Sequence, residues 1–399
     1  MTNFLNNITL ANLLKWREQF TARLNEKHPH FVTGYYLFFL AIYISGTFIK
    51  GTTMAGHLIT QHVIFLLLAI PAVFIVLKIA LFDHHSLMEL TVFALLECVL
   101  YNIGYHAGDF SLFYFIPFVY GAKDVDYRLV LKVFITVNVI GILIAMGLAL
   151  GGVIRNYEGI RSLYSPMTRY GMGAVYPSDF AARGFCVLMA YAALRRFRFS
   201  LPEYISYAAI AIWYYTLTNT RLDMMLMLLL FLLIIFYNKE AKLLQRASNQ
   251  LITLGMYIFI GIIFLMGLCY HPGSKLLGFV NTVLSGRLSY EQLTFQKYNI
   301  QLFGQFINQP GGGAYYIDSV FFRTIFMYGL VVFIMLLILI LAMNRRLISA
   351  KAFCLEICFM LFILSGAIDQ HFWDSSFNFI LLSLFANLKS FNDAQPEIE

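Results

Sequence analysis

The chain has 399 residues, of which 60% are hydrophobic and only 12% are charged. Soluble globular chains carry about 25% charged residues, so this composition leaves too little polar surface to keep the chain in water. The net charge of +7 does not indicate nucleic acid as a partner, because Lys and Arg cluster in short segments between apolar blocks, where membrane proteins retain positive charge on the cytoplasmic side. The composition therefore predicts an all-α polytopic membrane protein in contact with membrane lipid.

Residues 1–31 carry charges throughout and lack the short apolar core of a signal peptide. We expect a cytoplasmic N-terminal segment, either a solvated tail or a weak amphipathic helix on the inner leaflet, with an apolar stripe made of Leu10, Leu13, Leu14, Phe20 and Leu24. A transmembrane domain is expected over residues 32–390, and a cytoplasmic tail over residues 391–399.

Apolar blocks of about 20 residues match the length that crosses a bilayer core of about 30 Å. The blocks predict twelve transmembrane helices, of which the fourth and the last are short. They cover residues 33–49, 59–82, 87–105, 110–122, 130–152, 180–195, 203–219, 222–237, 251–270, 320–343, 353–368 and 376–390.

Basic clusters in the short loops orient these predicted helices. The clusters lie within residues 123–132, 195–198, 239–246 and 345–351. With twelve spans and the N-terminus inside, all four clusters fall on the cytoplasmic side, as the positive-inside rule requires. Both termini are then expected in the cytoplasm.

Two long segments, near residues 155–180 and 271–319, are then expected on the outer side. In or beside them lie five arginines that oppose the inside-positive trend: Arg155, Arg161, Arg169, Arg183 and Arg287. These arginines are either solvated, because long loops cross regardless of charge, or they bind phosphate, which suits the planar fork of Arg. Apolar residues at helical spacing predict that the second loop is partly helical.

Polar residues at the outer ends of three predicted spans are candidates for chemistry, because polar groups at membrane depth are costly and often functional. The candidates, in chain order, are Arg221, Tyr315, Tyr316, Asp318, Ser319, Asp369 and His371. Arg221 either takes part in function, pairs with Asp223, or extends its side chain to the lipid head groups. Arginines suit phosphate, and a carboxylate or an imidazole can deprotonate a sugar hydroxyl. No cluster of Cys and His supports a metal site, so we expect neither a metal nor another cofactor.

Four motifs in combination resemble those of the Wzy-type polysaccharide repeat-unit polymerases, the O-antigen and capsule polymerase group. They are Asn219-Thr220-Arg221, then Ser285-Gly286-Arg287 with Leu302-Phe303-Gly304, then Tyr316-Ile317-Asp318-Ser319 with Tyr328-Gly329, and finally Asp369-Gln370-His371-Phe372. The architecture resembles this group over the whole chain, whereas the motif-level similarity begins near residue 215.

The resemblance implies an inverting, metal-independent enzyme of the bacterial plasma (inner) membrane. Such an enzyme transfers a growing glycan from undecaprenyl diphosphate onto another lipid-linked repeat unit. The implied partners are the undecaprenyl-diphosphate-linked oligosaccharide and, in the same pathway, a chain-length regulator and a flippase.

Candidate roles follow for the residues named above. We expect Arg169, Arg183, Arg221 and Arg287 to bind the diphosphate, and Tyr315, Tyr316 and Ser319 to orient the acceptor. The catalytic candidates are Asp318, His371 and Asp369. Related enzymes often have His followed by Asn or Ser where this chain has Asp318-Ser319, so the base is either Asp318 or His371.

A transporter or flippase of lipid-linked oligosaccharide is the alternative, because the helix count and the embedded charges fit it as well. Transporters place their substrate near the bilayer midplane on broken helices. In this sequence the polar residues gather instead at the predicted outer face, which favours surface chemistry over alternating access.

Overall fold

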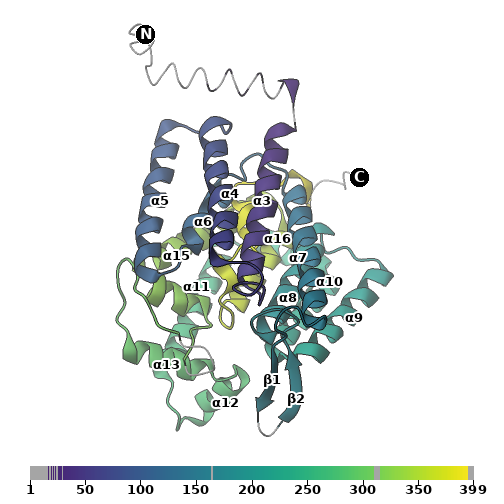
Figure 1. Cartoon of the computed structure of the whole chain (residues 1–399), viewed down its shortest axis with the longest axis vertical. Coiled ribbons are helices and arrows are strands. Elements are labelled where there is room, and N and C mark those ends of the chain that lie inside the picture. Colours follow the sequence, from purple (N-terminus) through teal and green to yellow (C-terminus); the bar gives the residue numbers. More distant parts are fainter. Residues whose placement is uncertain are drawn as a thin grey trace.

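The computed structural model describes residues 30–162, 165–309 and 315–393, together with residues 17, 19, 21, 23 and 26–28. The apolar stripe expected near the N-terminus lies outside the described residues. Most of the described chain is helical, as the composition predicts (Figure 1). The longer helices are α3 (Phe31–Lys50), α4 (Gln61–Leu81), α5 (Leu87–Ala107), α6 (Ser111–Tyr120), α7 (Tyr127–Leu150), α8 (Pro177–Leu194), α9 (Leu201–Thr218), α10 (Arg221–Arg246), α11 (Asn249–Cys269), α15 (Leu330–Ser349) and α16 (Phe353–Ser365).

The described helices have the character of membrane spans. Seven of them are long and apolar enough to cross a membrane, namely α3, α4, α5, α7, α10, α11 and α15, whereas α6 and α16 are apolar but shorter. Large apolar side chains such as Phe65, Val73 and Leu143 are more than half exposed. Soluble proteins rarely expose apolar surface on this scale, so the chain is a membrane protein. The count of twelve spans stays a prediction.

Local signals in the sequence fix the ends of these helices, and α5 is an example. At its start the Glu89 amide donates to the Ser86 hydroxyl, and the Ser86 amide donates to the Glu89 carboxylate. This reciprocal pair satisfies two backbone donors that a helix start leaves free. At its end Gly108 adopts a φ of 70°, which glycine accepts without steric cost.

The span predicted over residues 320–343 is not one continuous helix. It begins as the short turn α14 (Val320–Phe322), continues as a π-helical turn (Arg323–Tyr328), and breaks at Gly329 before α15 starts. Gly329 has a φ of 94°, and it touches Gly304, which has a φ of 83°. A Cβ at either glycine would collide with backbone atoms beside the other. The segments around Gly304 and Gly329 cross at this point, and the Gln305 amide donates to the Met327 carbonyl (2.9 Å). The crossing of the two segments interrupts the helix.

The helix predicted over residues 376–390 is absent, and this expectation was wrong. The segment consists of turns and the 3₁₀ turn Ile380–Leu384. Near its start Ser375 bonds Thr47, at the end of α3, and near its finish the backbone of Asn387 pairs with that of Val125 and Tyr127, at the start of α7. The segment therefore runs along the bundle. Residues 376–383 are all buried, whereas Phe385 and Lys389 are exposed. Burial inside the protein is the condition under which irregular backbone is tolerated at membrane depth.

The loops that carry the predicted inside-positive clusters meet at one end of the bundle, which we call the inner end after the predicted orientation. Asp393 joins two of these loops to α10, the helix whose end carries the basic cluster 239–246. Its carboxylate accepts bonds from Arg196 (3.1 Å) and from the Tyr237 hydroxyl (2.6 Å), and its amide donates to the Lys351 carbonyl (3.1 Å). The assignment of these loops to the cytoplasmic side of the membrane stays a prediction.

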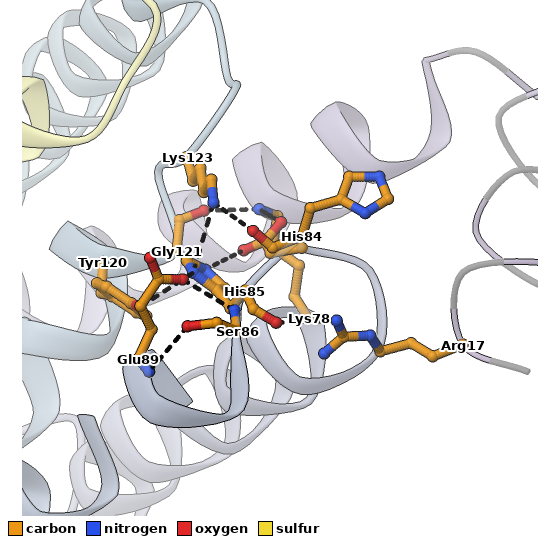
Figure 2. A network of polar contacts seen from close by, with 10 residues as sticks. Arg17, Lys78, His84, His85, Ser86, Glu89, Tyr120, Gly121 and Lys123 are labelled. Atoms are coloured by element: carbon orange, nitrogen blue, oxygen red, sulfur yellow. Dashed lines mark hydrogen bonds and ion pairs between the residues drawn. The ribbon is translucent and has the colours of Figure 1, made fainter. Parts of the chain in front are cut away.

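A network of polar contacts also ties the α4–α5 loop to the α6–α7 loop at the inner end (Figure 2). Lys78, which has no exposed surface, donates to Asp83 Oδ1 (2.6 Å) and to the Gly121 carbonyl (2.7 Å). Lys123 donates to the carbonyl of His84. These contacts hold the two loops together inside the protein, although Asp83 Oδ2 and His85 Nε2 have no hydrogen-bond partner among the described residues.

The opposite end, which we call the outer end, carries the two segments predicted to lie outside the cytoplasm. The first contains an antiparallel hairpin, β1 (Glu158–Ser162) and β2 (Ser165–Tyr170), so the fold departs here from the predicted all-α class. The second contains the short helices α12 (Lys275–Val283) and α13 (Arg287–Lys297). Figure 1 shows the hairpin, α12 and α13 together at one end of the molecule.

Candidate active site

A polar cavity of about 340 Å³ opens at the outer end. Its wall comes from β2, the starts of α8, α10 and α13, the strand-like segment before α14, and the turn after α16. Segments up to 200 residues apart in sequence thus contribute to one space. The charged and polar residues of its wall are Arg169, Tyr176, Ser178, Asp179, Asp223, Arg287, Tyr290, Tyr315, Tyr316, Asp318, Asp369 and Gln370.

Arg287 and Asp318 form an ion pair in this wall. Arg287 Nη2 lies 3.1 Å from Asp318 Oδ2, and the two side chains keep 17% and 33% of their surface exposed. Gly286, with a φ of 89°, turns the chain so that Arg287 begins α13, and Arg287 Nη1 donates to the Leu284 carbonyl (3.1 Å). Burial raises the pKa of Asp318 above its usual range, against the opposing effect of Arg287. The pair is open to a ligand in the cavity.

His371 lies between two carboxylates behind this pair. Its Nε2 atom is 3.2 Å from Asp369 Oδ1 and 3.4 Å from Asp179 Oδ1. Burial alone would lower the pKa of His371, but the negative charges of Asp369 and Asp179 outweigh it and raise that pKa to about 9. The ring also stacks on Phe377, with 3.7 Å between centroids. At neutral pH His371 is therefore an imidazolium held in place.

Asp369 and Asp223 complete the acidic side of the cavity. Burial raises the pKa of Asp369, although His371 acts in the opposite direction. Asp223 is buried in the first turn of α10. Four carboxylates, those of Asp179, Asp223, Asp318 and Asp369, thus line one small space, and mutual repulsion favours the binding of a proton by one of them.

Arg169 supplies the second guanidinium of the wall. It extends from β2, and its Nε donates to the Thr218 carbonyl (2.7 Å) at the end of α9. The following residue, Asn219, adopts a φ of 47°, which ends α9 and lets α10 start two residues later. The hairpin is thereby joined to the polar turn 218–223.

The two tyrosines before α14 line the cavity with hydroxyl groups. The Tyr315 hydroxyl lies 2.8 Å from Thr294 Oγ1 on α13. The Tyr316 hydroxyl accepts a bond from Gln370 Nε2, and burial raises its pKa to about 12. Both hydroxyls therefore stay protonated and can take part in hydrogen bonds with a bound sugar.

Four residues predicted for the site do not line the cavity. One is His371, which instead contacts the cavity residues Asp369 and Asp179. The Arg221 side chain is exposed at the first position of α10. Ser319 is buried, and its hydroxyl donates to the Gly366 carbonyl (3.3 Å). Arg183 is buried beneath the site, where its guanidinium lies 4.2 Å from the ring centroids of both Phe48 and Phe377. Arg183 supports the ring on which His371 stacks.

Sequence reasoning missed Asp179 as a site residue and read Asp223 only as a partner for Arg221. Both are acidic residues in the first turn of a helix, α8 and α10 respectively, where a carboxylate is usually explained by the helix dipole. The sequence signal that sets them apart is their position beside a predicted outer end of a span. Glu291, on the turn of α13 after Arg287, is also buried, and burial raises its pKa to about 8.

The arrangement can bind an anion through two guanidinium groups and can accept a proton on a carboxylate beside them. Comparison of the chain with known proteins gave no match, whether to family models, to curated proteins or to solved structures.

Proposed function

We propose that this chain is a membrane glycosyltransferase that polymerises lipid-linked oligosaccharide repeat units. The reaction transfers a growing glycan from undecaprenyl diphosphate onto a second lipid-linked unit, with inversion and without a metal. One observation carries the proposal: Arg169 and Arg287 face four carboxylates in a single cavity at one end of an apolar helical bundle. A diphosphate needs the guanidinium groups, and an attacking hydroxyl needs a proton acceptor.

In the proposed reaction the acceptor hydroxyl oxygen attacks the anomeric carbon of the donor sugar. The bond from that carbon to the diphosphate oxygen breaks, and the electron pair leaves with undecaprenyl diphosphate. Arg287 and Arg169 stabilise the charge that develops on this leaving group. The proton of the hydroxyl goes to Asp318.

The ion pair between Arg287 and Asp318 gives this mechanism its order of events. While the pair is intact, Arg287 competes with any proton for Asp318. A diphosphate that takes over the Arg287 fork releases Asp318. The affinity of this carboxylate for the hydroxyl proton then rises, because its burial is no longer opposed by Arg287. Donor binding thus prepares the base.

The choice between Asp318 and His371 as the base now favours the carboxylate. An imidazole with a pKa raised to about 9 already carries its proton at neutral pH and cannot accept another. His371 then acts by holding Asp369 and adding positive charge near the diphosphate. Asp369 is the second candidate, because it is also a cavity carboxylate with a raised pKa.

The proposal places the chain in the bacterial plasma membrane, with the outer end facing away from the cytoplasm and the inner-end basic loops within it. The donor and the acceptor are then undecaprenyl-diphosphate-linked oligosaccharides delivered by a flippase. A chain-length regulator of the same pathway is a further expected partner.

An assay with purified protein and the lipid-linked repeat unit of its own host tests the function. We expect a ladder of products without added nucleotide sugar or divalent metal. Arg287→Lys keeps the charge but loses the bidentate fork, so we expect activity to fall about 10- to 100-fold. Arg155→Lys, at an exposed arginine in the other outer segment, is the matched control. Absence of a ladder with the wild-type protein would contradict the function, and full activity of Arg287→Lys would contradict the role of that arginine.

A further inference from the structure

A second cavity, of about 210 Å³, lies at the outer end where α3 ends, α4 begins and the α5–α6 turn crosses. Much of its wall is aromatic, with rings from Tyr43, Phe65, Phe110, Tyr114 and Trp373. Phe65 is more than half exposed, whereas Tyr43 and Trp373 are buried. The cavity therefore reaches from the lipid-facing surface into the bundle.

Polar side chains accompany these rings. Lys50 ends α3 with half of its side chain exposed, and its ammonium lies 3.3 Å from Ser111 Oγ. Gln61 is exposed at the start of α4, and Asp374 forms part of the same wall. Rings beside hydrogen-bonding groups suit a sugar, which has apolar C–H faces and polar hydroxyls. The ammonium group suits a phosphate as a point charge.

A partly buried relay of polar side chains connects the second cavity to the first. Asp109, in the wall of the second cavity, accepts bonds from the Tyr328 hydroxyl (2.8 Å) and from Arg323 Nη2 (3.5 Å). Arg323 Nη1 donates to Gln370 Oε1 (2.5 Å), and Gln370 bonds Tyr316 in the wall of the first cavity. The positive charges of Arg323 and Lys50 hold the pKa of Asp109 below its usual range, although burial acts in the opposite direction.

Two backbone features strengthen this connection. Arg323 begins the π-helical turn Arg323–Tyr328, and π turns are frequent at functional sites. Residues 368–370 line the first cavity, whereas Trp373 and Asp374 line the second. The single 3₁₀ turn His371–Trp373 therefore joins the two walls.

We propose that the second cavity binds the acceptor, a lipid-linked glycan whose hydroxyl attacks the donor held in the first cavity. The inference rests on the proposed function, in which two lipid-linked glycans must be bound at once. The first cavity has the guanidinium groups that a leaving diphosphate requires. The second has one ammonium group and aromatic rings, which suit an acceptor whose diphosphate stays intact.

A single-transfer assay separates the two substrates. The donor analogue carries hydrogen in place of the hydroxyl that would accept a glycan, so it can only donate. The acceptor analogue is a phosphonate with a methylene group in place of the oxygen between the sugar and the diphosphate, so it can only accept. Gln61→Trp narrows the rim of the second cavity, so we expect the acceptor KM to rise about tenfold or more and the donor KM to stay within about twofold. Tyr114→Ala, which removes a ring from the wall, should raise the acceptor KM in the same way.

His62→Trp is the matched control, because His62 is exposed, neighbours Gln61 and does not line the cavity. The inference would be overturned if the acceptor KM were unchanged in both Gln61→Trp and Tyr114→Ala, or if only the donor KM rose. The cavity would then be a site for bilayer lipid.

Direct binding of the phosphonate acceptor to the purified protein distinguishes the two proposals. If the wild type transfers nothing but Gln61→Trp still weakens this binding, the proposed function fails and the glycan site stands. If transfer proceeds and the binding is the same in wild type and variant, the assignment of the second cavity fails alone.

Discussion

The two ends of this bundle each hold an ion pair, and the pairs differ in their burial and in what surrounds them. At the inner end Lys78 and Asp83 lie 2.6 Å apart with 0% and 4% of their side chains exposed. At the outer end Arg287 and Asp318 lie 3.1 Å apart with 17% and 33% exposed, beside a cavity. The inner pair joins loops, and the outer pair can exchange its partner for a ligand. Burial of charge alone therefore does not mark a site; charge beside accessible space does.

The same contrast separates the cations of the two pairs, although Asp83 Oδ2 at the inner end is also buried without a hydrogen-bond partner among the described residues. Lys78 also donates to the Gly121 carbonyl, so its ammonium group is already committed to the fold. Arg287 has a buried Nε for which the described residues provide no hydrogen-bond partner. A buried donor left without a partner costs free energy, and a bound anion would recover it.

The largest effect is expected from Asp318→Asn, which keeps the shape of the side chain and removes the proton acceptor. We expect the rate of transfer to fall about 10²- to 10⁴-fold, the usual contribution of a general base, with donor binding retained. Turnover of purified protein measures this, with Asp124→Asn, in an exposed loop of the inner end, as the control. Normal turnover by Asp318→Asn and a loss in Asp369→Asn would move the base to Asp369.

Next in size is the effect of Lys78→Met, which leaves Asp83 buried without its partner. Breaking a buried pair from one side costs about 3–5 kcal/mol of stability. We expect a lower unfolding temperature in detergent, with near-normal turnover per folded molecule at low temperature. The double variant Lys78→Met/Asp83→Asn, which leaves no buried charge, should recover part of the loss. A turnover defect as large as that of Asp318→Asn would show that the inner end also takes part in the reaction.

The smallest effect concerns the proton of His371. Because folding raises the pKa of His371 from 6.5 to about 9, the stability it contributes is fully present below the unfolded value and is lost as the pH rises through about 9. The unfolding temperature of the wild type should therefore fall between these pH values more steeply than that of His371→Gln. Parallel pH profiles for the two proteins would contradict a charged His371.

Much of the helical framework is predictable from the sequence, because an apolar run of sufficient length has few alternatives in a bilayer. The predicted spans 33–49, 59–82 and 87–105 each lie within two residues of the observed α3, α4 and α5 at both ends. The segment 376–390 shows where this logic fails. Asn378 accepts bonds from the amides of Ile380 and Leu381, and such side-chain bonds compete with a helix. Apolar composition cannot distinguish a lipid-facing helix from irregular chain inside the protein.

The site was predictable in its parts but not in its assembly. Asp318 and Asp369 were recognisable as polar residues at the outer ends of spans, and Arg169 and Arg287 as arginines of the two outer segments. The structure brings all four to one cavity. Arg183 has the same sequence character yet lies among aromatic rings. Which side of a helix faces the cavity depends on packing between distant segments, and a single sequence holds little information on it.

The contact between Gly304 and Gly329 has a consequence for mutational scanning. Each glycine adopts a positive φ, and neither has room for a Cβ because the backbone of the other segment lies against it. Substitutions at both positions should therefore abolish activity as completely as substitutions at the cavity, although neither glycine lines it. A screen that scores only loss of product would rank them among the catalytic residues. A second measurement, of the amount of folded protein in the membrane, is needed for each variant. It separates residues that maintain the structure of the outer end from residues that take part in the reaction.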